Sequence, residues 1–166
     1  MDLAGKRAIV FAEANYEDLE LWYPLLRLRE EGVEVVVVGT GSADSYSGRH
    51  GYPLTKIDAV ADKVDAKDFD AVIIPGGWAP DVLRRYASVL KIVRDATAQG
   101  KVVAAICHAG SVLVSANVLR GKTATCVVAI KDDLINAGAE YVDREVVRDG
   151  KLITSRRPAD LPAFMR

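Results

Sequence analysis

Short apolar runs alternate with longer stretches of helical periodicity along most of this chain. Two amphipathic stretches, 18–31 and 80–99, keep helical spacing, the second with a break near Tyr86. The apolar runs are short enough for buried strands and lie at 7–12, 33–39, 70–75 and 102–106. Such alternation predicts an α/β fold in which an open, mostly parallel sheet is covered by helices on both faces.

The remaining segments fit the same architecture. A Gly/Ser-rich connector at 40–51 is expected to form a hairpin or an edge segment, and a second hairpin is expected around Asp149-Gly150. Further predicted elements are helices at 108–119 and 131–139, a short strand at 123–128 and a terminal helix from Pro158. A chain of 166 residues is of domain size, so we expect one domain over 1–166.

Charge and composition narrow the classes of partner. The formal net charge is −1 and no Lys/Arg cluster is present, which disfavours nucleic acid and membrane surfaces as partners. The N-terminal apolar stretch is too short for a signal-peptide core or a membrane span. A cytoplasmic location is therefore expected.

Cofactor and metal signals are also weak. The two cysteines, Cys107 and Cys126, lack metal-ligand spacing, and the chain has only 2 histidines to assist them. Neither a G-x-x-x-x-G-K nor a G-x-G-x-x-G phosphate loop occurs. We expect free thiols, no metal site and no cofactor.

Cys107 lies where a buried strand gives way to a helix, at VVAAI-CHAG. A side chain on such a turn is exposed at the sheet edge, as in a nucleophile elbow, and the following helix dipole favours a thiolate. We therefore expect the pKa of Cys107 to lie well below the free-thiol value of about 8.5. The alternative is that Cys107 is a small buried hydrophobe, which is the expected role of Cys126.

Three loops leave the carboxyl ends of predicted strands, namely AEANYED, PGGWAPD and CHAG. In open α/β sheets, ligands bind where the strand order reverses, outside these ends. The three loops are therefore expected to converge around Cys107.

Several motifs together resemble the PfpI/ThiJ family, which includes intracellular proteases, bacterial stress proteins and the Parkinson-disease protein deglycase. The resemblance implies a single-domain, flavodoxin-like three-layer sandwich of the class I glutamine amidotransferase type. It covers nearly the whole chain and rests on the motifs AICHAG, IIPGG, NYEDLELWYP, GRHGY, LRGKTAT, IKDDLINAGAE and TSRRPADLPAF.

The resemblance also implies roles for individual residues. Cys107 corresponds to the nucleophile, and Glu17 to an acid that lies against its sulfur with a raised pKa. His108 is expected to act with Cys107 and with an acid from a neighbouring subunit, Asp81. Taken without the family, Glu17 and Asp81 could each be a solvated acid in the first turn of a helix.

Backbone donors for an oxyanion are implied at Gly77 and Ala109. The chain departs from many relatives by having Ala109-Gly110 after Cys-His in place of Gly-Pro, and Val127 in place of a tyrosine. Trp78 is expected to make the pocket mouth more apolar. Outside this region, we expect Arg156 and Arg157 to pack and pair around the final turn.

Three functions remain open at this stage. The first is a cysteine-dependent, cofactor-free enzyme that converts small reactive carbonyls, such as methylglyoxal or glyoxal, to hydroxy acids and thereby protects against stress. The second is an intracellular cysteine peptidase, and the third is a redox-sensing stress protein with an oxidisable Cys107. The chain is expected to form a homo-oligomer, at least a dimer, with a dimer and a hexamer both open, and to act on a small carbonyl compound or a peptide.

Overall fold

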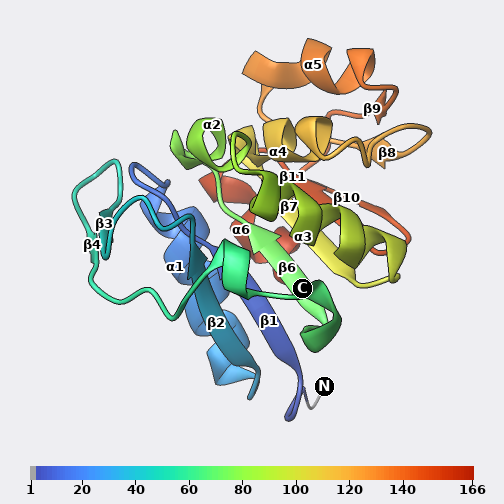
Figure 1. Ribbon diagram of the computed structural model, residues 1–166. Coiled ribbons are helices and arrows are strands. Elements are labelled where there is room, and N and C mark those ends of the chain that lie inside the picture. The colour runs from blue at the N-terminus through green and yellow to red at the C-terminus, as the bar shows by residue number, and fades with distance from the viewer. Residues whose placement is uncertain (1–2) are drawn as a thin grey trace.

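The computed structural model describes residues 3–166 and is built on a seven-stranded sheet (Figure 1). All neighbouring strands run parallel except β10 and β11. In spatial order the strands are β10 (Val146–Asp149), β11 (Leu152–Ser155), β7 (Val102–Ile106), β6 (Ala71–Ile74), β1 (Arg7–Phe11), β2 (Glu34–Gly39) and β5 (Ala59–Val60). This confirms the predicted α/β class and the mostly parallel sheet.

Helices cover both faces of this sheet (Figure 1). Because β2 follows β1 in one direction and β7 follows β6 in the other, right-handed connections place the intervening helices on opposite faces. Accordingly α1 contacts α6, and α4 contacts both α2 and α3. The helices are α1 (Asp18–Glu30), α2 (Ala79–Leu83), α3 (Ala87–Ala98), α4 (Gly110–Ser115), α5 (Lys131–Asn136) and α6 (Leu161–Phe164).

Two small sheets lie outside the central one. The strands β3 (Tyr46–Ser47) and β4 (Pro53–Leu54) form an antiparallel hairpin within the connector where a hairpin or edge segment is predicted. The strands β8 (Thr123–Ala124) and β9 (Glu140–Tyr141) pair in parallel. The predicted strand at 123–128 is thus much shorter, and Cys126 lies in the loop after it, where its side chain is buried as expected.

The core-facing side of α1 differs from the predicted one. Within the predicted helix at 18–31, Leu19, Trp22, Leu26 and Arg29 keep helical spacing and from the sequence indicate one face, but Leu19 and Leu26 are 57% and 56% exposed. A second stripe, which contains Glu20, Leu21, Pro24 and Leu25, is buried against the sheet. Both stripes are largely apolar, so periodicity could not choose between them. The choice places a carboxyl group, that of Glu20, inside the protein.

The loops that follow β1, β6 and β7 meet at the point where the strand order reverses. An isolated antiparallel bridge joins Tyr16 to Gly77. Two backbone hydrogen bonds reinforce it: Trp78 N donates to Asn15 O at 2.8 Å, and Glu17 N donates to Gly76 O at 3.0 Å. The predicted convergence of the loops is therefore confirmed for the first two, and Cys107 follows β7 immediately beside them.

No helix within residues 3–166 has the length and apolar character needed to span a membrane. The expected cytoplasmic location stays a prediction.

Candidate active site

Cys107 occupies a strained turn at the end of β7. Its φ angle is +62°, in the left-handed region that residues other than glycine rarely adopt. The 3-10 turn η3 (Cys107–Ala109) then leads into α4, and the Cys107 side chain is 9% exposed. This is the strand-turn-helix geometry of a nucleophile elbow, as the sequence predicted.

The carboxyl group beside this thiol belongs to Glu20. Its side chain is 0% exposed, and the Glu20 carboxyl and the Cys107 thiol each act on the other's pKa. Gly76 N donates to Glu20 Oε2 at 2.9 Å, whereas Oε1 has no hydrogen-bond partner within residues 3–166. Because a charge on a buried oxygen without a partner is costly, this surrounding favours the protonated form of Glu20.

Glu17, which the sequence placed against the sulfur, has a different position. It is the N-cap of α1, and its Oε2 accepts from Glu20 N at 3.1 Å. Its Oε1 lies 3.7 Å from Nε2 of His50. A capping side chain must turn back toward the first helical turn, so the carboxyl one turn further along reaches the thiol instead. The placement of Glu17 at the sulfur is thus wrong, and its catalytic role stays a prediction.

Glu20 could have been found from the sequence if the buried stripe of the helix had been started at Glu20 instead of at Leu19. It lies four residues before Pro24, within the stripe that continues through Leu25. A glutamate in an otherwise apolar stripe is buried with that stripe, and burial is costly unless the carboxyl is neutral or paired. Such a residue therefore indicates a functional site. The competing stripe through Leu19 and Leu26 concealed this signal.

Burial raises the pKa values of both acidic groups. The pKa of Glu20 rises from 4.5 to about 8, chiefly through desolvation and secondly through the charge of Glu17. Desolvation raises the pKa of Cys107 to about 12, and a charge on Glu20 adds to this effect. The expected low pKa of Cys107 is therefore wrong, because desolvation outweighs the backbone N–H groups of His108 and Gly77 that favour the thiolate.

His108 contacts the thiol despite being its sequence neighbour. Its Nδ1 lies 3.4 Å from Cys107 Sγ. Burial lowers the pKa of His108, and Arg49 lowers it further, while Asp81 acts in the opposite direction. The imidazole is consequently neutral at pH 7 and able to accept the thiol proton.

Asp81 lies in the first turn of α2, where it is exposed and influences His108 of its own chain. Its N–H donates to Trp78 O at 3.1 Å. The sequence offered the helix-start position as one alternative, whereas an effect of Asp81 on His108 was expected from a neighbouring subunit. Its contribution across a subunit interface stays a prediction.

The two glycines after β6 allow the loops to approach one another. A Cβ on Gly76 would lie 2.4 Å from Glu20 Oε2 and 2.7 Å from Cys107 Cβ. A Cβ on Gly77, whose φ is +78°, would lie 2.3 Å from Glu17 N. Side chains at these positions would therefore separate the acid from the thiol.

The residues implied as oxyanion donors border the same space. The backbone N–H of Gly77 acts to lower the pKa of Cys107, less strongly than burial raises it, and Ala109 is buried in the turn after Cys107. Val127 N donates to Cys107 O at 3.4 Å, so this departure from the family pattern adjoins the nucleophile. Trp78 is exposed, and its ring centroid lies 5.5 Å from that of His108. The oxyanion roles of Gly77 and Ala109 stay predictions.

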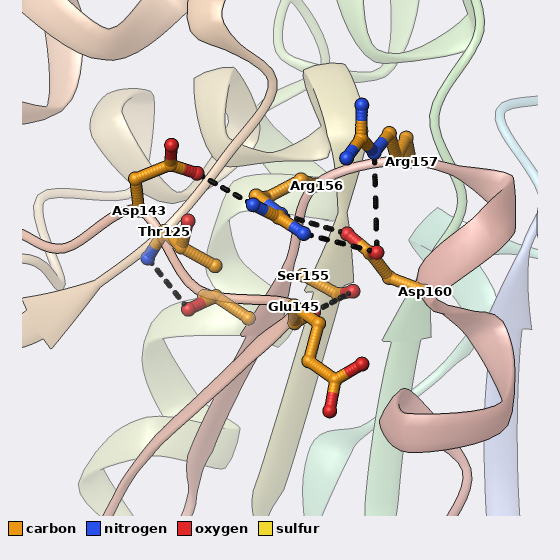
Figure 2. A network of polar contacts seen from close by, with 8 residues as sticks. Thr125, Asp143, Glu145, Ser155, Arg156, Arg157 and Asp160 are labelled. Atoms are coloured by element: carbon orange, nitrogen blue, oxygen red, sulfur yellow. Dashed lines mark hydrogen bonds and ion pairs between the residues drawn. The ribbon is translucent and has the colours of Figure 1, made fainter.

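A polar network supports the strand beside β7 (Figure 2). Arg156 donates to Asp160 Oδ2 at 2.9 Å and to Asp143 Oδ1 at 2.7 Å, and Arg157 Nε lies 3.9 Å from Asp160. Ser155 Oγ donates to Glu145 O at 2.5 Å. Since Ser155 pairs with Ile106, these contacts fix the end of β11 next to the strand that carries Cys107. The expected pairing of both arginines is confirmed.

Metal ligation is not indicated by the residues that the structure describes. Among positions 3–166, no group of three or more His, Cys, Asp or Glu side chains is placed to hold a metal ion. The groups around Cys107 can instead transfer protons: a buried carboxyl on one side and a neutral imidazole on the other.

Comparison with known proteins relates the chain as a whole to one family. The model of the DJ-1/PfpI family matches residues 6–166. The chain is 48% identical to Deglycase PH1704 of Pyrococcus horikoshii, covering 95% of each chain. It is 41% identical to Protein/nucleic acid deglycase 2 of Escherichia coli, covering 98% of this chain and 95% of the relative. The crystal structure of Drosophila melanogaster DJ-1beta matches with a TM-score of 0.88 at 32% identity, over 96% of this chain and 86% of that one.

The raised pKa of Glu20 makes stability depend on pH. The folded state holds this proton more tightly than the unfolded chain, so its stabilising effect is complete below pH 4.5 and is lost as pH rises through about 8. At about 1.4 kcal/mol per pKa unit, the total effect is at most about 5 kcal/mol. We expect wild type to lose several kcal/mol relative to Glu20→Gln between about pH 5 and pH 9.

Urea unfolding of both proteins across this range measures the difference. Glu30→Gln, which removes an exposed carboxyl on the same helix, is the matched control and should follow the wild-type curve. Parallel curves for wild type and Glu20→Gln would show that Glu20 is ionised in the folded protein.

Proposed function

Because the chain belongs to the DJ-1/PfpI family and is an enzyme of the PfpI type, we propose that it converts small reactive carbonyl compounds through Cys107. The substrates would be 2-oxoaldehydes such as methylglyoxal or glyoxal, and the products hydroxy acids. One observation carries the proposal: the Cys107 thiol lies between a carboxyl that keeps its proton and an imidazole that is neutral.

This arrangement suits addition of a thiol to an aldehyde. His108 accepts the thiol proton at Nδ1, for which its other ring nitrogen must carry the hydrogen. The sulfur then forms a bond to the aldehyde carbon, and Glu20 donates its proton to the carbonyl oxygen, giving a hemithioacetal. Since Glu20 is neutral before this step, it does not repel the developing thiolate.

Glu20 can also act in the steps that follow. Its carboxylate is now placed to take the proton from the hemithioacetal carbon and to return it to the adjacent carbon, which was the second carbonyl carbon of the substrate. The hydroxyl proton of the hemithioacetal moves to the oxygen of that adjacent carbon, so that the hemithioacetal carbon becomes the new carbonyl. The product of this transfer is a thioester of the hydroxy acid on Cys107. Water hydrolyses the thioester, releases the hydroxy acid and restores the thiol.

Exposure favours a small substrate over a peptide. Cys107 is only 9% exposed, so an aldehyde reaches the sulfur more readily than a peptide carbonyl with its flanking residues. The cysteine peptidase is nevertheless kept as a second candidate, because Sγ and Nδ1 of the Cys107-His108 pair lie 3.4 Å apart. The redox-sensing and stress-protective roles considered from the sequence stay predictions.

The test is methylglyoxal consumption with chiral detection of lactate, without added glutathione or metal. Cys107→Ala should abolish lactate formation, and Cys126→Ala should retain it because Cys126 lies outside the site. Glu20→Gln should lower kcat by about 10²-fold or more, as loss of a general acid does, whereas Glu17→Gln should have a smaller effect. Lactate formation that survives in Cys107→Ala would contradict the proposal.

If every protein is inert toward methylglyoxal, the proposed reaction fails on this substrate. Cleavage of a fluorogenic peptide by wild type and by His108→Ala would then test the peptidase candidate.

We further propose that the exposed stripe of α1 is covered by a second copy of the chain. Leu19, Leu26 and Tyr52 are 57%, 56% and 60% exposed and border one groove of about 560 Å³. Trp22 and His50 also line this groove, which therefore adjoins the Glu17-His50 pair beside the site. Contiguous apolar surface of this kind favours association.

Analytical ultracentrifugation tests this assembly. Wild type should sediment as a dimer or larger, and Leu26→Lys should shift it toward the monomer. Ile135→Lys, a matched change at an exposed position on α5, should leave the assembly unchanged. A wild-type monomer would contradict the proposal.

A further inference from the structure

Arg49 is a cation near the site that the proposed chemistry does not use. It follows β3 in the β3–β4 hairpin, and its side chain is exposed. Within residues 3–166 the guanidinium makes no ion pair or hydrogen bond, and it lies over the ring of Trp78, whose centroid is 5.8 Å from Cζ. Its donors are therefore free to bind a ligand.

The backbone that carries Arg49 is firmly held. Arg49 N donates to Tyr16 O at 2.8 Å, which ties the hairpin to the loop after β1. The Asp18 carboxylate accepts from His50 N and Tyr52 N, each at 3.0 Å. A Cβ on Gly48 would lie 2.3 Å from Asp18 Oδ1, so only glycine allows this approach. The hairpin thus presents Arg49 from a fixed position.

Three aromatic and polar contacts connect Arg49 to the nucleophile. The guanidinium faces the Trp78 ring, the Trp78 ring lies 5.5 Å from the His108 ring, and His108 Nδ1 lies 3.4 Å from Cys107 Sγ. The positive charge of Arg49 also lowers the pKa of Glu20 and that of His108. Arg49 and Trp78 therefore border the approach to Cys107.

We propose that Arg49 binds an anionic group of the substrate, so that the site prefers carbonyl compounds that also carry a carboxylate. This inference rests on the proposed function and specifies its substrate class. A guanidinium offers a planar pair of donors that matches a carboxylate, and stacking on an aromatic ring restricts its orientation. Trp78 supplies that ring.

The test uses two alkylating reagents of the same chemistry, of which one is an anion and the other is neutral. Iodoacetate and iodoacetamide both form a bond from Cys107 sulfur to carbon and release iodide, but only iodoacetate carries a carboxylate. We expect Arg49→Gln to lower the ratio of the iodoacetate rate to the iodoacetamide rate by about fivefold to tenfold, the loss of one charge-assisted contact at an exposed site. Mass spectrometry of the Cys107 peptide measures both rates.

Two further variants sharpen the result. Arg49→Lys should retain part of the preference, since it keeps the charge and loses the planar donors. Arg94→Gln, which removes an exposed arginine on α3, should leave the ratio unchanged. An Arg49→Gln protein in which both rates fall equally, or in which neither changes, would overturn the proposal, because Arg49 would then act on thiol reactivity in general or not at all.

Alkylation requires no turnover, so its outcome is separate from that of the proposed reaction. If methylglyoxal is inert but the rate ratio depends on Arg49, the anion site stands and the carbonyl chemistry fails. If lactate is formed but the ratio is unaffected by Arg49→Gln, the chemistry stands and the anion preference fails.

Discussion

Two acidic groups, the carboxyl of Glu20 and the thiol of Cys107, are buried side by side where the strand order of the sheet reverses. Water is excluded from Glu20, so a charge on either group is disfavoured and a charge on both is disfavoured more strongly. The protein therefore holds at least one proton between them at neutral pH. That shared proton supplies the acid for carbonyl chemistry, and the neighbouring imidazole of His108 supplies the base.

Several energetically unfavourable backbone features allow Glu20 and Cys107 to approach each other. Cys107 has a left-handed φ, and Gly77 occupies a conformation and a space that other residues cannot share. Gly76 leaves room for the Glu20 carboxyl and donates a hydrogen bond to it. On the other flank, the Arg156 network holds β11 against β7 (Figure 2). Strain at the nucleophile is thus supported by contacts from strands on both sides.

The sequence was sufficient to predict the architecture but not to identify Glu20 as the acid beside Cys107. Alternating apolar runs predicted the parallel sheet, the break at Tyr86 and the hairpin at Asp149-Gly150, because each depends on local periodicity or turn chemistry. The position of Cys107 followed in the same way. Glu20 was missed because α1 has two apolar stripes, and only packing in three dimensions decides which of them is buried. The pKa of Cys107 was mispredicted for a related reason, since desolvation depends on neighbours that periodicity does not identify.

The protonation state of Glu20 at neutral pH is the central claim of this account. Infrared difference spectroscopy of wild type minus Glu20→Gln measures it directly, through the carbonyl stretch of a neutral carboxylic acid. The account predicts that this band is present at pH 7 and disappears as the pH rises past about 8. A carboxylate signal from Glu20 already at pH 6 would contradict it, because the acid would then hold no proton to donate beside Cys107.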